Sequence, residues 1–322
     1  MPLLILCSTS FAISLVTVAL IRQRWGQQLL DIPNERSSHA HPTPRGGGLG
    51  FIIAFALTSV VAAVTVFSVP VTLWLVLIPL TAVGILDDRQ GVPAGVRYAV
   101  QLATAAVAVA GFGIDALFPQ ATGVAELGAI ALTLIGFTAL INFYNFMDGL
   151  DGLVAGTTAV QLGFLAFTLN QPFLWLLVAA LLGFLRWNWS PAQIFMGDAG
   201  STVLGATVAA ALLNSDRPSV QAWSALVVTF PLMADAVYTL GRRLWQRENI
   251  FRAHRTHLYQ RLQQSGWSHG QVASTYIGIT VLVAVSLSLG AWGAVLSSVG
   301  IIGALIGGEL LVHQFSQASA DV

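Results

Sequence analysis

The feature that most constrains the fold is a series of long apolar stretches that fills most of the chain. A helix that crosses a bilayer needs about 20 mostly apolar residues, and by that criterion the sequence predicts about eleven membrane-spanning helices. They cover residues 3–21, 47–67, 69–86, 94–112, 126–146, 152–169, 172–187, 199–213, 220–240, 272–292 and 294–315. We therefore expect an all-α integral membrane protein that forms one domain over residues 1–322.

Composition excludes a soluble protein. Only 9% of the residues are charged, whereas soluble domains carry about 25%, so charged side chains are too few to cover a solvated surface. The formal net charge is zero, and we expect no nucleic-acid partner. Cys7 is the single cysteine, which excludes an intramolecular disulfide and a cysteine-based zinc site.

The distribution of arginine predicts the orientation in the membrane. All 14 basic residues are arginines, and cytoplasmic loops of membrane proteins are enriched in basic residues. If the loop after the first span is cytoplasmic, every arginine except Arg217 lies inside. We therefore predict that the N-terminus lies outside and the C-terminus inside.

Acidic residues gather at the predicted cytoplasmic ends of the spans. Asp87 and Asp88 end the third span in GILDDRQG, Asp148 and Asp151 follow the fifth in NFYNFMDGLDG, and Asp198 lies in IFMGDAGS. Carboxylates on one face repel one another, so a cation should accompany them. Oxygen ligands suit Mg²⁺ or Mn²⁺. The pattern favours a metal site, although DGLDG alone could be a solvated turn.

Three other segments contain polar groups that suit phosphate. RGGGLG (residues 45–50) and MGDAGS (196–201) could bind an anion through backbone N–H groups where helices begin, or could simply pack helices closely. In FRAHRTHLYQR, His254 and His257 lie among arginines. That segment could contact anionic lipids, but we favour a clamp for a phosphorylated substrate.

These residue types suit phosphoryl transfer. A metal held by carboxylates neutralises charge that develops on the transferred phosphorus, while arginine and histidine bind the remaining oxygens. A site at the end of a helix bundle in a membrane suits an acceptor that is itself a membrane lipid. A transporter remains an alternative, but its acids should lie near the midplane and its halves should repeat.

Five motifs carry a resemblance to a known family. DIPNERSSHAHPTPRGGG, GILDDRQG, NFYNFMDGLDG, IFMGDAGS and FRAHRTHLYQRL occur in this order between residues 31 and 266. Together they resemble the polyprenyl-phosphate N-acetylhexosamine-1-phosphate transferases, the WecA-like and MraY-like enzymes of glycosyltransferase family 4. The resemblance implies transfer of a sugar-1-phosphate from a UDP-N-acetylhexosamine to undecaprenyl phosphate, with release of UMP. It also implies Mg²⁺ or Mn²⁺ as cofactor, the cytoplasmic face of the bacterial inner membrane, and a homodimer as one option.

The resemblance also assigns roles by position. Asp198 and Asp151 match metal ligands, and Asp87 matches the base that faces the lipid phosphate. The expected catalytic residues are Asp87, Asp88, Asp148, Asp151 and His257. The expected substrate-binding residues are Arg36, His39, Arg45, Asn142, Asn145, Phe195, His254 and Arg255.

Two departures from the family pattern bear on the substrate. Ser37 stands where many members have lysine, and residues 254–260 read HRTHLYQ where hexosamine-type members often read Asp-Arg-x-His-Leu-His-His. The pattern looks closer to the branch that starts O-antigen or capsule chains with 6-deoxy-N-acetylhexosamines such as N-acetylfucosamine, with N-acetylglucosamine as the alternative. The missing triple histidine argues against the peptidoglycan enzyme, which uses UDP-MurNAc-pentapeptide. A CDP-alcohol phosphotransferase should have a longer acid-glycine signature and fewer spans.

Overall fold

The computed structural model describes residues 2–25, 29–33, 38–39, 41–249 and 254–318, and within these ranges it is almost entirely helical. Its helices are α1 (Pro2–Trp25), α2 (Gly48–Thr65), α3 (Val71–Gln90), α4 (Ala94–Phe112), α5 (Val124–Met147), α6 (Leu153–Thr168), α7 (Leu174–Asn188), α8 (Asp198–Leu213), α9 (Ser219–Leu226), α10 (Phe230–Trp245), α11 (Leu258–Gln264), α12 (His269–Leu287) and α13 (Ala291–Ala318). A 3₁₀ turn, Val227–Thr229, joins α9 to α10.

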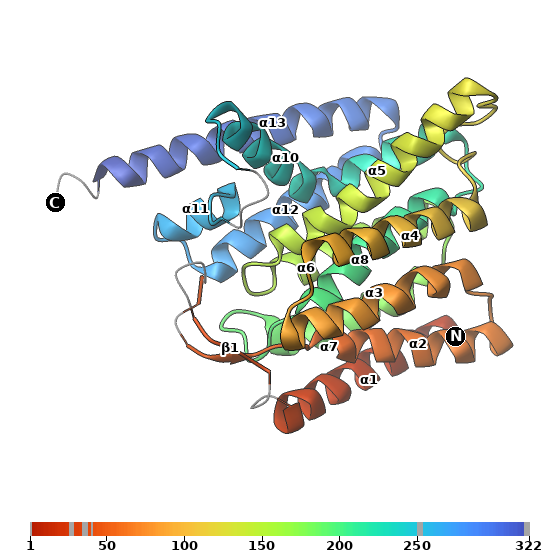
Figure 1. The fold of residues 1–322 in the computed structure, drawn as a ribbon, viewed down its shortest axis with the longest axis horizontal. Coiled ribbons are helices and arrows are strands. Elements are labelled where there is room, and N and C mark those ends of the chain that lie inside the picture. The colour runs from red at the N-terminus through yellow and green to blue at the C-terminus, as the bar shows by residue number, and fades with distance from the viewer. Residues whose placement is uncertain (1, 26–28, 34–37, 40, 250–253, 319–322) are drawn as a thin grey trace.

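The expectation of an all-α membrane protein is confirmed. Within the described ranges, 8 helical segments are long and apolar enough to cross a membrane, and α9 and α10 form one of them, Ser219–Trp245. The shorter apolar helices α6, α7 and α8 account for the other three predicted spans. Helix α1 begins at one end of the bundle and α13 ends at the other (Figure 1). The count of about eleven spans and the orientation stay predictions.

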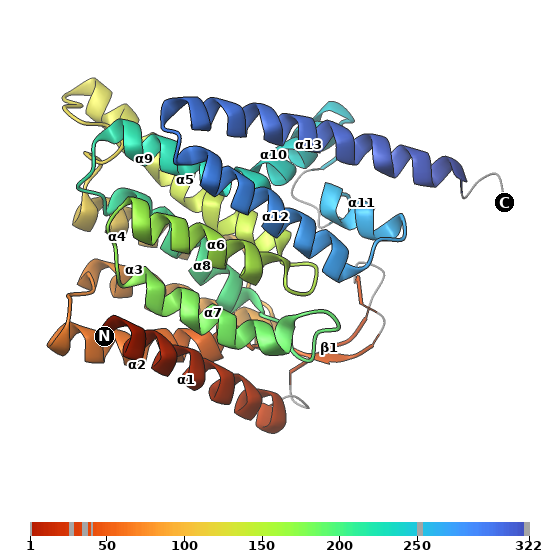
Figure 2. The same cartoon turned by 180° about the vertical axis from the view of Figure 1, so that it is seen from behind.

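Helix α8 is the central helix of the bundle. It lies behind α3 and α4 in Figure 1 and behind α6 and α7 in Figure 2. Every residue from Ala199 to Leu213 is buried, as expected for a helix that is apolar on all sides. By contrast, outer helices such as α5 and α13 expose many leucine, isoleucine and valine side chains, which is what a lipid-facing surface requires.

Glycines bring three helices very close to α8. A Cβ added at Gly84 of α3 would lie 2.3 Å from the Cα of Ala199, and one at Gly48 of α2 would lie 2.6 Å from the Cα of Gly200. A Cβ at Gly205 would lie 2.8 Å from the Cα of Ile141 in α5. Small residues at helix contacts allow such close approach of backbones in membranes. Because Asp87 and Asp88 follow Gly84 by one turn, this packing fixes their distance from α8.

A short hairpin attaches the first loop to the α7–α8 loop. Strands β1 (Leu30–Asp31) and β2 (Thr43–Pro44) pair antiparallel, with Asp31 opposite Thr43. The N–H of Phe195 donates to the carbonyl of Pro44 at 2.8 Å, and the N–H of Gly47 donates to the carbonyl of Phe195 at 2.9 Å. These bonds hold Arg45 beside the start of α8.

The contact between α3 and α8 can be tested at Gly84. Gly84→Ala should lower the midpoint of thermal unfolding in detergent, because overpacking a close contact costs about 1–3 kcal/mol. Gly278→Ala is the matched control, since a Cβ there meets nothing within 4 Å, and removal of a mid-helix glycine stabilises by about 0.5–1 kcal/mol. Equal behaviour of the two variants would contradict this account of the packing.

Candidate active site

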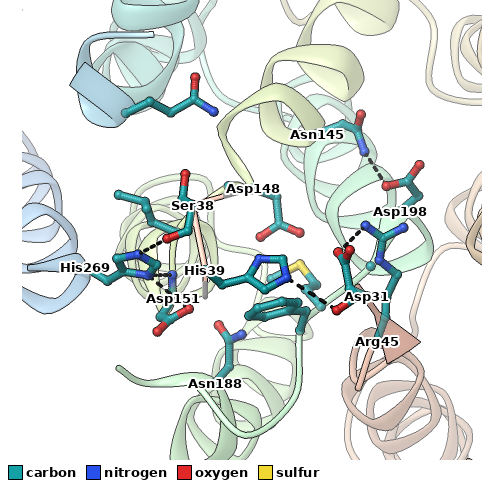
Figure 3. A pocket seen from close by; sticks show the side chains of 16 residues that line it. Asp31, Ser38, His39, Arg45, Asn145, Asp148, Asp151, Asn188, Asp198 and His269 are labelled. Atoms are coloured by element: carbon teal, nitrogen blue, oxygen red, sulfur yellow. Dashed lines mark hydrogen bonds and ion pairs between the residues drawn. The ribbon is translucent and has the colours of Figure 1, made fainter. Parts of the chain in front are cut away.

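A cavity of about 270 Å³ opens at the end of the bundle where the first loop and the α7–α8 loop lie. Figure 3 shows the side chains that line it. The ends of α5, α7 and α8 meet the first loop there. Seven of the sequence-predicted residues line it: His39, Arg45, Asn145, Asp148, Asp151, Phe195 and Asp198. Sequence reasoning missed five other polar lining residues: Asp31, Ser38, Asn188, Gln260 and His269.

A second, smaller cavity of about 60 Å³ adjoins the first. Asp87, Arg97 and Asn142 line it, together with apolar side chains of α3 such as Leu80 and Val83. Asn145 and Asp198 line both cavities. The two cavities therefore share a polar wall, and the smaller one is the more apolar of the two.

Asp88 holds the start of α8. Its carboxylate accepts the N–H of Asp198 at 3.0 Å and that of Ala199 at 3.4 Å. Arg45 Nη1 lies 3.6 Å from the same carboxylate. Gly197, with φ of 80°, leaves room for it, because a Cβ there would lie 2.5 Å from Asp88 Oδ2. The first N–H groups of a helix favour an anion, and at the start of α8 the carboxylate of Asp88 is that anion.

Asp87 and Asp198 lie on either side of an arginine. Arg97 Nη1 donates to Asp87 Oδ2 at 2.6 Å and lies 3.6 Å from Asp198 Oδ2. The N–H of Val92 also donates to Asp87, at 2.6 Å, and Asn145 Nδ2 donates to Asp198 Oδ1 at 3.2 Å. Sequence reasoning counted Arg97 only toward orientation. Its position one turn inside a predicted span was the available signal, since ionisable residues within spans are commonly functional.

Asp148 lies among three other acidic side chains. Burial raises the pKa of Asp148 to about 8, and the nearby carboxylates of Asp198, Asp88 and Asp151 raise it too, although Arg45 opposes them. Within the described ranges, no N–H or side chain donates a hydrogen bond to the Asp148 carboxylate. Such a site favours a bound cation.

The donor set fits Mg²⁺ or Mn²⁺. The described part of the chain has no group of three or more His, Cys, Asp or Glu side chains arranged to hold a metal. Mg²⁺ needs no such cage, since one or two carboxylates, waters and substrate phosphates hold it. Asp198, a ligand expected from the sequence, and Asp148 could supply those oxygens, and the metal-binding role expected for Asp151 stays a prediction. The carboxylate of Asp151 already accepts the N–H of Ala192 at 3.0 Å and contacts His269.

An aromatic pair lines the same cavity. The rings of His39 and Phe195 meet edge to face, with centroids 4.8 Å apart. His39 Nε2 lies 3.4 Å from the carbonyl of Asp31. Asn142 lies outside the larger cavity and donates to Gln101 Oε1 at 2.7 Å. Arg36 lies outside the described residues.

His254, Arg255 and His257 do not line either cavity, although Gln260 in the same segment lines the larger one. His257 is buried, and its Nδ1 lies 3.7 Å from Asp235 Oδ1. The ring of His254 stacks on His257 at 4.8 Å, and burial, with nearby cationic groups, lowers the pKa of His254 to about 4. The Arg255 carbonyl accepts a hydrogen bond from Gln264. These three predicted residues thus lie together, separate from the carboxylates that line the cavities.

Asp235 connects α10 to the start of α11. Its buried carboxylate accepts the N–H of Leu258 at 2.8 Å, the N–H of Tyr259 at 3.0 Å and the hydroxyl of Tyr276 at 2.7 Å. The Tyr259 hydroxyl then donates to the carbonyl of Phe146 at 3.0 Å, at the end of α5. This chain of contacts places α11 against the turn that carries Asp148.

Removal of Asp235 should destabilise the protein. Asp235→Ala leaves two N–H groups and two hydroxyls, those of Tyr276 and Thr239, buried without their acceptor. The loss is about 3 kcal/mol or more and should lower the thermal midpoint in detergent. Asp235→Asn keeps one acceptor oxygen and should fall between that variant and the wild type. Asp216→Ala, at an exposed position in the loop before α9, is the control. A small effect of Asp235→Ala would contradict the assigned contacts.

Comparison with known proteins shows the family of the chain. Residues 70–216 match glycosyl transferase family 4. The chain is 32% identical to the decaprenyl-phosphate N-acetylglucosaminephosphotransferase of Mycobacterium leprae, over 86% of this chain and 80% of the relative. It is 31% identical to a probable undecaprenyl-phosphate N-acetylglucosaminyl 1-phosphate transferase of Bacillus subtilis, over 81% and 78%. A phospho-N-acetylmuramoyl-pentapeptide-transferase of Listeria innocua is 27% identical, over 88% and 98%. The chain therefore belongs to glycosyl transferase family 4, the WecA-like and MraY-like membrane enzymes.

Proposed function

We propose that the protein transfers an N-acetylhexosamine-1-phosphate from a UDP-sugar to a polyprenyl phosphate such as undecaprenyl phosphate, and releases UMP. The observation that carries the proposal is the wall of Asn145 and Asp198 shared by the two cavities. A polar nucleotide-sugar in the larger cavity and a lipid phosphate in the smaller, more apolar one would meet there. The names of the relatives from Mycobacterium leprae and Bacillus subtilis support the same reaction.

The carboxylates and arginines have distinct parts in this proposal. Mg²⁺ bound by Asp148 and Asp198 would neutralise charge on the pyrophosphate. Asp87 accepts the proton of the lipid phosphate, and Arg97, 2.6 Å from Asp87, binds the phosphate oxygens. One bond forms between the lipid phosphate and the sugar-bearing phosphorus, and the bond from that phosphorus to UMP breaks. Phe195 and His39 contact the nucleotide, while Arg45 and Asn145 contact the pyrophosphate.

The sugar is proposed to be an N-acetylhexosamine without a peptide. Tyr259 and Gln260 stand where hexosamine-type members often have histidines, and Gln260 lines the larger cavity. These departures support a 6-deoxy sugar such as N-acetylfucosamine, whereas the relatives' names support N-acetylglucosamine. In either case the product would start a cell-surface polysaccharide such as O-antigen at the bacterial inner membrane.

A direct assay tests this proposal. Purified protein, undecaprenyl phosphate and Mg²⁺, incubated with a panel of UDP-sugars, should release UMP with one sugar preferred, and a chelator should stop the release. Asp198→Asn should abolish it, while Asp216→Asn should not. Asp87→Asn should lower kcat by about 10²–10⁴-fold, as expected for a lost general base, with a nearly unchanged KM for the UDP-sugar. Uptake of a solute into sealed vesicles without UMP release would support a transporter instead.

Metal affinity should depend on pH. Because the pKa of Asp148 is raised to about 8, the carboxyl is mostly protonated at pH 7, and a cation must displace that proton. Mg²⁺ affinity should therefore rise as the pH increases from 6 to about 8 and level off above that value. Calorimetric titration at several pH values measures this, and Asp148→Asn should flatten the dependence. A pH-independent affinity of the wild type would contradict the assignment of Asp148.

A further inference from the structure

We propose that His269 is a positioning residue for the nucleotide-sugar subsite, because it ties the DGLDG turn to the first loop across one wall of the larger cavity. The inference rests on the proposed function for its kinetic consequence, but its structural part stands alone. His269 is the first residue of α12 and lines the cavity with 15% of its side chain exposed. It lies 118 residues from Asp151 and 231 residues from Ser38, the two groups that it contacts.

The imidazole uses both of its nitrogens. His269 Nε2 lies 3.0 Å from the carbonyl oxygen of Ser38, and a carbonyl oxygen only accepts, so Nε2 carries a proton and donates it. His269 Nδ1 lies 3.2 Å from Asp151 Oδ1 and 3.4 Å from the N–H of Asp151. The other oxygen of Asp151 accepts the N–H of Ala192 at 3.0 Å. One histidine and one carboxylate thus join four segments of the chain.

The backbone of His269 is itself held in place. Ser268 precedes it as the N-cap of α12, and its hydroxyl oxygen accepts the N–H of Gln271 at 3.2 Å. The N–H of Ser268 donates in turn to Gln271 Oε1 at 2.8 Å. This reciprocal capping fixes the first turn of the helix. The ring therefore extends toward the cavity from a rigid support.

The contact with Ser38 completes a bridge across the cavity. On one side, the carbonyl of Pro44 fastens the first loop to the N–H of Phe195 at 2.8 Å, and the ion pair of Arg45 with Asp31, at 2.7 Å, joins the two strands within the loop. His269 fastens it on the other side. His39 lies between these two attachments (Figure 3). Without His269, His39 would be held from one side only, and Asp151 would lose its contact with the imidazole.

The contacts of His269 should affect the binding of only one substrate, the UDP-sugar. Ser38, Asp151 and His269 line the larger cavity, whereas the smaller cavity is lined by other residues, among them Asp87 and Arg97. Loss of His269 should therefore weaken binding of the UDP-sugar and leave the lipid phosphate subsite intact. A residue that only stabilised the fold would affect both substrates together.

Three variants separate the two contacts. His269→Ala removes the contacts with both Asp151 and Ser38. His269→Asn places an amide where Nδ1 contacts Asp151, and His269→Gln places an amide where Nε2 contacts the Ser38 carbonyl. His269→Ala should raise the KM for the UDP-sugar about tenfold, as loss of a hydrogen bond to a charged group predicts. The KM for undecaprenyl phosphate and kcat should stay within about twofold. Asn and Gln should each restore part of the affinity. His313→Ala, with 71% of its side chain exposed on α13, is the control.

Hydrogen exchange tests the structural part without any substrate. In the full-length protein in detergent, His269→Ala should speed exchange at the amide of Ala192 and across residues 41–47, with His313→Ala unchanged. Unchanged exchange, or an equal rise of both KM values, would overturn the proposal. If His269→Ala fails to fold, the Asn and Gln variants test the proposal by the same two measurements, the KM values for the two substrates and the hydrogen exchange rates. Faster exchange in a protein whose wild type releases no UMP would support the positioning and refute only the proposed function.

Discussion

Buried carboxylates control how this end of the bundle is built. In a membrane protein, an acid away from water must find a partner, and here backbone N–H groups are the commonest partners. Asp88 accepts two N–H groups at the start of α8, and Asp235 accepts two at the start of α11. Asp87 and Asp151 each accept one from a neighbouring loop. Each acid thereby attaches one piece of chain to another, and the cavity walls follow from these attachments.

The same requirement separates the acids other than Asp87, the proposed base, into two groups. Asp88, Asp151 and Asp235 have both oxygens engaged by N–H groups or by basic and hydroxyl side chains. Asp148 and Asp198 face the cavity with fewer donors from the described residues. This difference makes the second group the better candidates for a metal and the first group the supports that hold them. The low dielectric of the site makes the distinction large in energy.

Sequence reasoning predicted the helices and the shared location of the acids, because apolar length and residue type are local properties. It could not decide whether the glycines of RGGGLG and MGDAGS bind an anion or allow close packing of helices. The structure answers for MGDAGS: Gly200 packs against Gly48, and Gly197 makes room for Asp88, which occupies the start of α8. The importance of Arg97 and His269 was also hidden. Arg97 lies 10 residues from its partner Asp87, and His269 lies 118 residues from its partner Asp151. Only tertiary packing brings such groups together.

The wall of Asn145 and Asp198 that the two cavities share has a structural consequence. Because Asp198 lines both cavities, a shift of its side chain toward the larger cavity changes its distance from Arg97 in the smaller one, which is 3.6 Å. The position of Asp198 therefore affects the shape of both cavities. A change at this shared wall in one cavity thus alters the other cavity directly, without movement of a distant hinge.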